Sequence, residues 1–293
     1  MTTSTQLLPA KNELVLVTGA STGMGAATAR ELARRGYHVL AGVRRETDAN
    51  QIQADRIEPV ILDITAPDDI ESVAARVGQD SGSRRLRAVV NNAGIAVNAP
   101  VEVLPLAEWR RQFDVNLFGH IAVTQAVLPF LISSRGRIVN ITSVGGKIAM
   151  PTHGAYAGAK FALEAVSDSL RRELAPLGVQ VVIVEPGGVT TEMAGRGIAT
   201  ANQLAEGMTS DQHGRYDGLI GAITAQAASF TKTGVPADIA GRAIADTITT
   251  PNPRTRYTIG RDAAILVRVA RIVTDRTLDA ILRRNLAPHY AKR

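Results

Sequence analysis

The chain has 293 residues, of which 45% are hydrophobic and 20% charged, and these proportions exclude an intrinsically disordered protein. Aromatic residues make up only 4%, so Ala, Val, Ile and Leu must fill the core, as is typical of a buried parallel sheet covered by helices. The absence of cysteine excludes disulfides, thiolate metal sites and cysteine nucleophiles.

The net charge of +6 is compatible with nucleic acid, an anionic membrane surface or a phosphate-rich cofactor. The basic residues are scattered, however, and no aromatic residues interleave with them to stack bases, so we expect no nucleic-acid partner. The first residues are polar, and the apolar runs are far shorter than the ~20 residues of a spanning helix. We therefore expect a cytoplasmic protein without membrane association.

Strand and helix patterns alternate along the first half of the chain. A short buried strand over residues 13–18 precedes a glycine-rich turn, and a helical pattern follows over 24–35 until Gly36. The further segments of this half are strands over 37–42, 60–62 and 86–90 and a helix over 67–77.

The second half continues the alternation, and its pattern then loosens. It predicts helices over 106–132 and 152–176 and strands over 136–141 and 179–184. Residues 192–232 are rich in Gly, Ala, Thr and Gln without a firm period, and we expect a mobile substrate-binding insertion there. The remaining segments are a helix over 236–249, a strand over 256–259 and a helix over 263–273, the last within a C-terminal helical extension over 263–293.

Strands that alternate with helices form βαβ units with right-handed crossovers. We therefore predict an α/β fold: a Rossmann-like doubly wound parallel sheet with helices on both faces, in a single domain over residues 1–293. The basic amphipathic helix over 263–273 could lie on a membrane, and we expect it instead to pack on the core of its own domain.

A glycine-rich turn, Thr18 to Gly25, lies between the first strand and its helix. Glycine is needed where the chain turns tightly and where backbone approaches a pyrophosphate, and the start of the helix offers free N–H groups. Such a turn can also be structural only, but its place between a strand and a helix favours dinucleotide binding. Its spacing, Gly19-x-x-x-Gly23-x-Gly25, differs from the common G-x-G-x-x-G fingerprint.

Together with later motifs, this turn resembles the short-chain dehydrogenase/reductase family. The later motifs, in chain order, are Asp63, Asn91-Asn92-Ala93-Gly94, Asn116, Ser143, Tyr156 with Lys160, and Pro186-Gly187. The resemblance is strong over residues 12–192 and looser over 233–262. It implies a nicotinamide-dependent oxidoreductase that assembles as a homodimer or homotetramer. The segment Arg256-Tyr257-x-x-Gly260 is similar to the branch of hydroxysteroid and retinol dehydrogenase-like enzymes.

The end of the second strand predicts which dinucleotide is bound. An NAD site has a carboxylate at this strand tip, which accepts hydrogen bonds from the two free hydroxyls of the adenosine ribose. This sequence has Val43 and Arg44 there instead. A guanidinium pairs with a 2′-phosphate, so Arg44 favours NADP(H), and Ser21 adds a hydrogen bond to the same phosphate. Arg45 fits better as a solvated surface residue.

The resemblance implies the remaining cofactor contacts. Asp63 and Ile64 would meet the adenine beside the Asn91–Gly94 turn, although an Asn-Asn turn can equally brace neighbouring strands. Val189 and Thr191 would meet the nicotinamide carboxamide, and Thr190 could be a helix cap. The predicted cofactor-binding residues are Gly19, Ser21, Gly23, Met24, Gly25, Arg44, Asp63, Ile64, Asn92, Ala93, Gly94, Tyr156, Lys160, Pro186, Gly187, Val189 and Thr191.

Four residues make up the predicted catalytic group. Tyr156 and Lys160 lie four residues apart on one face of a helix. A cation ~4 Å from a phenol at an effective dielectric of ~20 stabilises the phenolate by roughly 4 kcal/mol, so we expect Lys160 to lower the pKa of Tyr156 by about 3 units. Ser143 follows a strand, where its hydroxyl can hold a substrate oxygen, and Thr142 is the alternative. The resemblance implies that the backbone of Asn116 binds a water molecule, which relays protons to Lys160. A local helix kink is the alternative reason for an asparagine inside a helix.

These residues predict an NADP(H)-dependent oxidoreductase that interconverts a ketone or aldehyde and an alcohol on a fairly apolar small molecule, with Tyr156 as acid and base. The alternative is a non-catalytic NADP(H)-binding regulatory protein, but the intact Ser143, Tyr156 and Lys160 disfavour it. A related epimerase or dehydratase usually has a different glycine spacing.

The five histidines are scattered, so we expect no metal site. We expect His153 to cap a helix or face solvent, and Met193 and Met208 to line the substrate pocket.

Overall fold

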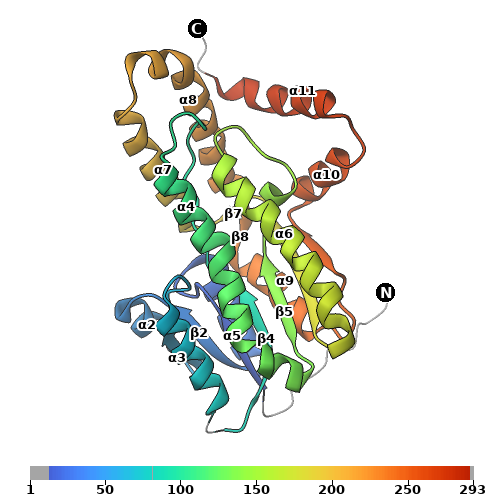
Figure 1. Cartoon of the computed structure of the whole chain (residues 1–293). Coiled ribbons are helices and arrows are strands. Elements are labelled where there is room, and N and C mark those ends of the chain that lie inside the picture. The colour runs from blue at the N-terminus through green and yellow to red at the C-terminus, as the bar shows by residue number, and fades with distance from the viewer. Residues whose placement is uncertain (1–12, 81, 291–293) are drawn as a thin grey trace.

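The computed structural model describes residues 13–80 and 82–290 and contains a sheet of seven parallel strands in the order β3-β2-β1-β4-β5-β6-β9 (Figure 1). The strands are β1 (Glu13–Val17), β2 (His38–Val43), β3 (Ile57–Ile61), β4 (Arg85–Asn91), β5 (Arg137–Ile141), β6 (Gln180–Pro186) and β9 (Arg256–Ile259). The order reverses between β1 and β4, as expected where a doubly wound sheet binds its ligand. The predicted Rossmann-like α/β fold is therefore confirmed.

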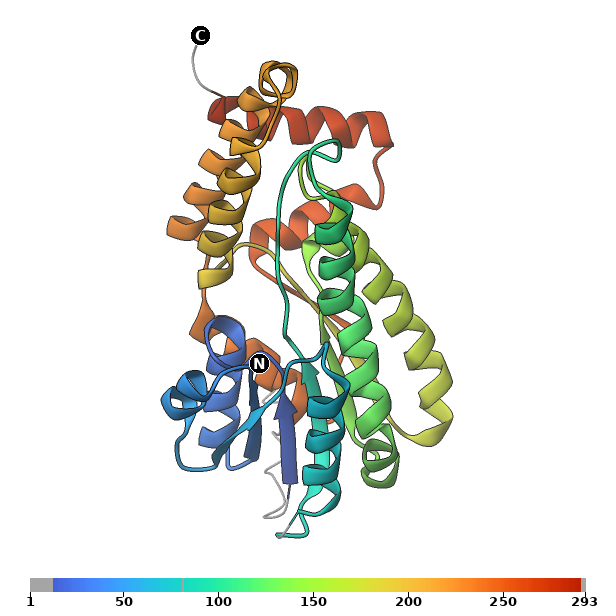
Figure 2. The same ribbon diagram turned by 60° about the vertical axis from the view of Figure 1, so that its left-hand side comes forward.

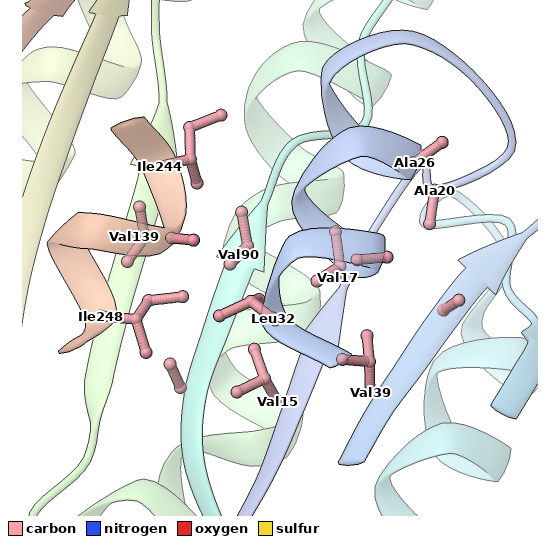
Figure 3. Close-up of a cluster of buried hydrophobic side chains, with 14 of the residues drawn as sticks. Val15, Val17, Ala20, Ala26, Leu32, Val39, Val90, Val139, Ile244 and Ile248 are labelled. Carbon is pink, nitrogen blue, oxygen red and sulfur yellow. The ribbon is translucent and has the colours of Figure 1, made fainter. Parts of the chain in front are cut away.

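Alternate residues of each strand enter opposite cores, because successive side chains of a strand point to opposite faces. In β1, Val15 and Val17 are buried with α1 (Gly23–Arg34) and α9 (Ala237–Thr249) on one face (Figure 3). Leu14 and Leu16 are buried with the helices of the other face, α3 (Pro67–Gly78), α5 (Gly119–Ser134) and α6 (Gly154–Leu174). Both faces are thus covered by helices, as predicted.

The predicted helix over 106–132 is interrupted. It consists of α4 (Leu106–Phe113), a wider π-helical turn over Asp114–Phe118, and α5. Among the described residues, the helical run 106–134 is the one that is long and apolar enough to cross a membrane, with a mean hydropathy of 1.6. Here Val123, Val127 and Leu131 of this run pack in the core beside the sheet.

Residues 192–232, for which the sequence shows no firm period, form two helices. These are α7 (Glu192–Glu206) and α8 (Ser210–Thr233), and they lie beyond the carboxyl ends of the strands with α10 (Arg261–Ala270) and α11 (Asp275–Leu286) (Figures 1 and 2). The period is weak because glycine, alanine and polar residues dominate both helices. The short strands β7 (Val189–Thr190) and β8 (Val235–Pro236) pair at the base of this insertion.

One short helix departs from the sequence prediction, whereas the last helix lies within the helical extension expected over 263–293. The helix α2 (Glu46–Ile52) follows β2, and α11 follows the predicted C-terminal helix. In α10, Val267 is buried whereas Ile265 is 59% exposed, and Ile272 just beyond the helix is 83% exposed. Only one side of this basic helix therefore packs on the protein.

Candidate active site

The glycine-rich turn after β1 is held by close backbone contacts. Gly19 has a φ of +63°, and a Cβ there would lie 2.7 Å from the Cα of Ala93. A Cβ at Gly25 would lie 2.3 Å from the carbonyl oxygen of Gly19. These contacts leave room only for glycine, and they place the N-terminus of α1 at the carboxyl end of the sheet, where its free N–H groups can meet a phosphate.

The Asn91–Gly94 turn braces this region, which was one of the two roles left open by the sequence. The Asn92 amide nitrogen donates to the carbonyl oxygens of Thr18 at 2.9 Å and of Gly19 at 3.0 Å. The Asn91 amide nitrogen donates to Asn140 Oδ1 at 2.8 Å. The turn therefore fixes β4 to β1 and β5, and Asn92 and Gly94 also line the cavity described below.

The far end of the expected cofactor site lies at the tips of β2 and β3. Arg44 is exposed immediately after β2, whereas Arg45 pairs with Asp48 at 2.8 Å. Asp63 Oδ1 accepts hydrogen bonds from the backbone and hydroxyl of Thr65 at 2.9 and 2.7 Å. Ile64 is buried and packs against Gly119 at the start of α5.

Ser143, Tyr156 and Lys160 converge at the carboxyl end of β5. Ser143 Oγ accepts a hydrogen bond from Gly145 N at 2.9 Å and is also hydrogen-bonded to Tyr156. Lys160 Nζ donates to the carbonyl oxygen of Ile141 at 2.9 Å and lies 6.0 Å from the centroid of the Tyr156 ring. The helix spacing of Tyr156 and Lys160 thus brings both side chains to the strand that carries Ser143.

Burial dominates the ionisation of the two α6 residues. It raises the pKa of Tyr156, and the hydrogen bond with Ser143 acts in the opposite direction. Burial also lowers the pKa of Lys160 to about 8, against the attraction of Glu164. The prediction that Lys160 lowers the pKa of Tyr156 is therefore wrong for the protein chain alone, because burial outweighs the other effects on the phenol and keeps it protonated.

Asn116 lies in the π-helical turn and is fully buried. Its side-chain amide donates to the carbonyl oxygen of Ile95 at 2.8 Å and accepts from Ile95 N at 2.9 Å. One helical turn earlier, Gln112 makes the same pair of bonds to Val97, both at 3.1 Å. These two amides fasten the extended segment after β4 to the helix, and a π-turn at such a position is common near functional sites.

A cavity of about 260 Å³ contains Ser143, Tyr156 and Lys160 in its wall. Its wall also includes seven of the other predicted cofactor residues: Met24, Asn92, Gly94, Pro186, Gly187, Val189 and Thr191. The opposite wall comes from the insertion, with Met193, Gly197 and Ala201 of α7 and Ile220, Ile223, Thr224 and Ala227 of α8. The other predicted residues lie outside this wall: Gly19, Ser21, Gly23, Gly25, Arg44, Asp63, Ile64, Ala93 and Asn116.

The structure refines two predictions about single residues of the pocket. His153 is the N-cap residue of α6, as expected, but its side chain makes no capping hydrogen bond: its ring lines the cavity, and Nε2 lies 3.1 Å from the amide nitrogen of Asn98. Burial lowers the pKa of His153. Met193 lines the cavity as expected, whereas Met208 is buried outside its wall. Asn98 belongs to no motif, so nothing in the sequence indicates its place beside the pocket.

A surface contact links the insertion to the segment before α4. Glu102, before α4, accepts hydrogen bonds from Arg215 Nη2 at 2.5 Å and from the Tyr216 hydroxyl at 2.8 Å. Both partners belong to α8. We refer to these three residues as the α8 latch.

Comparison with known proteins agrees with this geometry. Residues 13–202 match the family described as short chain dehydrogenase, and the chain belongs to the short-chain dehydrogenase/reductase family. It is similar to retinol dehydrogenase 5 of Mus musculus, with 37% identity over 94% of this chain and 90% of the relative. It is also similar to 3-amino-tetrahydro-pyrrolizinone reductase of Xenorhabdus hominickii, with 34% identity over 90% of this chain and 93% of the relative.

Solved structures show the same relationship. A short-chain dehydrogenase from Streptomyces avermitilis superposes with a TM-score of 0.73 at 28% identity, over 94% of this chain and 95% of that one. The protein is therefore an oxidoreductase that interconverts carbonyl and alcohol groups with a nicotinamide cofactor. The alternative of a non-catalytic regulatory protein finds no support in these comparisons.

Proposed function

We propose that the protein is an NADP(H)-dependent reductase and dehydrogenase of fairly apolar ketones, aldehydes and alcohols. The observation that carries the proposal is the single cavity in which Ser143, Tyr156 and Lys160 stand between cofactor-binding residues and an apolar wall from α7 and α8. The names of the relatives, a retinol dehydrogenase and a pyrrolizinone reductase, favour substrates with an apolar or cyclic skeleton.

The chemistry divides among three side chains. The bound nicotinamide supplies or accepts the hydride. Ser143 Oγ accepts from Gly145 N and is hydrogen-bonded to Tyr156, so a substrate oxygen that enters between the two hydroxyls can accept a hydrogen from each. Tyr156, whose pKa is raised by burial, keeps its proton and donates it to that oxygen as the carbonyl is reduced. Lys160 provides the neighbouring positive charge and a donor for the nicotinamide ribose, and Asn116 fixes the segment beside them.

Arg44 supports the choice of NADP(H). It is exposed at the tip of β2, and the neighbouring Arg45 is engaged with Asp48. A free guanidinium at this tip can pair with a 2′-phosphate, and Ser21 in the glycine turn adds a hydroxyl donor. The glycine turn and the cavity-lining residues of β6 and β7 would hold the pyrophosphate and the nicotinamide.

We further propose that α7 and α8, over 192–232, form a mobile lid of the pocket, that 263–293 is a helical extension of the single domain, and that the protein is a cytoplasmic homodimer or homotetramer. Phe118 and Phe161, on the helices that carry Asn116 and Tyr156, are 55% and 43% exposed, which supports an interface there. The packing of helix 106–134 inside the domain supports a location away from the membrane.

A substrate screen tests the proposed function. Apolar and cyclic ketones, aldehydes and alcohols are incubated with NADPH or NADH, or with their oxidised forms, and cofactor absorbance is followed. We expect turnover of some members of the panel, with NADPH preferred to NADH and with Tyr156→Phe inactive. Tighter binding of NADH, or turnover that persists in Tyr156→Phe, would contradict the proposal.

A further inference from the structure

Five charged side chains gather behind the catalytic helix, and we call them the buried charge cluster: Lys147, Glu164, Asp168, Glu185 and Arg256. Glu164 Oε2 lies 2.6 Å from Lys147 Nζ and 3.1 Å from Arg256 Nη2. Arg256 also pairs with Asp168 at 2.9 Å and approaches Glu185 Oε1 at 3.5 Å. The cluster joins α6 to β6 and β9. Arg256 of the Arg256-Tyr257 motif therefore makes ion pairs inside the protein.

Glu164 stands between the cluster and the catalytic residues. Its side chain is only 5% exposed, and its Oε1 accepts a hydrogen bond of 2.7 Å from the hydroxyl of Thr142. Thr142 is the neighbour of Ser143, and Glu164 follows Lys160 by one turn of α6. The hydroxyl of Thr142, the alternative to Ser143 in the sequence analysis, therefore donates to Glu164. Through this bond the carboxylate links the end of β5, next to Ser143, to α6, which carries Tyr156 and Lys160.

The charge of Glu164 also acts on Lys160. Burying a carboxylate costs free energy unless cations and donors surround it, and an apolar side chain would have held α6 on the sheet without that cost. Glu164 opposes the effect of burial on the pKa of Lys160, which lies at about 8. The other groups that face Lys160 are Tyr156 on the same helix, the Ile141 carbonyl oxygen of β5, and His120 of α5, whose own pKa burial lowers to about 3. Glu164 is therefore the negative charge that acts on this lysine among the described residues.

We propose that Glu164, held in place by Lys147 and Arg256, is a positioning residue that keeps Lys160 positively charged and fixes the strand end of Ser143 against the catalytic helix. The proposal rests on the proposed roles of Lys160 and Ser143. It extends the site beyond the residues that touch substrate or cofactor, and it explains why a buried carboxylate stands one turn from a buried lysine.

The direct test measures the ionisation of Lys160 in the free protein, without any substrate. The chain has only five lysines, Lys11, Lys147, Lys160, Lys232 and Lys292, so carbon-13 labelling of the lysine ε-carbon gives a simple spectrum that Lys160→Arg assigns. Glu164→Gln keeps the shape and can still accept from Thr142, but it removes the charge. We expect the pKa of Lys160 to fall by roughly one unit, the lower end for a neighbouring opposite charge.

Two further variants keep the test decisive. Glu185→Gln removes the other buried carboxylate of the cluster, which does not act directly on Lys160, and should leave the lysine titration within about 0.3 units of the wild type. Lys147→Met removes a cation that competes with Lys160 for Glu164, while Arg256 and Thr142 still hold the carboxylate in place, and it should move the pKa of Lys160 upward. Circular dichroism checks that each variant is folded. An unchanged Lys160 titration in folded Glu164→Gln or in Lys147→Met would overturn the proposal.

The pH dependence of activity separates this role from a merely structural one. If the pKa of Lys160 falls from about 8 to about 7, the charged fraction at about pH 8 falls roughly five-fold and hardly changes at about pH 6. Glu164→Gln should therefore lose about five-fold in kcat/KM at the higher pH only. An equal loss at both pH values would refute the electrostatic role. A shifted Lys160 titration with no turnover of any substrate by the wild type would support the Glu164–Lys160 coupling and would contradict the proposed function alone.

Discussion

Lys160→Met should alter the pH dependence of stability in a direction that the structure fixes. Burial, opposed by Glu164, lowers the pKa of Lys160 from 10.5 in a model peptide to about 8 in the folded protein. Below the folded pKa, both states are protonated and the folded state carries the full cost of the buried charge. Between the two pKa values the unfolded chain binds more protons, so the free energy of unfolding of the wild type rises with pH.

The size of this effect follows from the same two pKa values. Between about pH 7 and about pH 10 the lysine contributes an increase of about 2.5 kcal/mol to the free energy of unfolding. Lys160→Met lacks this contribution, and the remaining titrating groups cancel when the variant is subtracted from the wild type. Urea denaturation of both proteins at several pH values measures that difference. A difference that stays constant over this range would refute the assignment of a buried, titrating Lys160.

Three further predictions concern the cofactor, the proton and the lid. Tyr156→Phe keeps the ring but removes the proton, so single-turnover NADPH oxidation should slow by roughly 10²–10⁴-fold while NADPH affinity hardly changes; a retained rate would exclude Tyr156 as the donor. Arg44→Asp should weaken NADPH binding by about 2–4 kcal/mol and NADH binding far less, as measured by fluorescence titration; equal losses would contradict the pairing. Glu102→Gln breaks the α8 latch and should speed amide exchange at the start of α8 about two- to five-fold, whereas Glu108→Gln, which breaks the surface pair with Arg111, should not.

The sheet and the central site could be predicted because local patterns determine them. Buried strands such as β5 and β6 are short apolar runs that a local pattern reveals. Each motif residue lies either just after such a strand or on one face of a helix. Ser143, Tyr156 and Lys160 are accordingly found in one cavity. The short helix α2 has only seven residues, too few for a helical period to give a clear signal.

The remaining features depend on contacts between distant parts of the chain. The helices α7 and α8 line the cavity, and in α8 the small and polar residues leave little helical period that would reveal the helix. Glu164 and Arg256 are far apart in sequence, so neither residue alone indicates a shared buried cluster. The amides of Asn116 and Gln112 bind backbone rather than a ligand, and a single sequence does not distinguish these two uses of a buried amide.

The pairing of β7 with β8 makes the insertion that holds α7 and α8 a separable part of the protein. Val189 stands opposite Val235, and Thr190 opposite Pro236, so the chain leaves and re-enters the sheet domain at one place. Residues 192–234, which leave Thr191 in place, could therefore be replaced by a segment of another length without rerouting the strand that precedes Ser143 or the helix that carries Tyr156. The proposed substrate-binding segment and the proposed catalytic residues thus lie in different stretches of the chain. Exchanging this cassette between relatives should transfer selectivity while the hydride-transfer machinery stays intact.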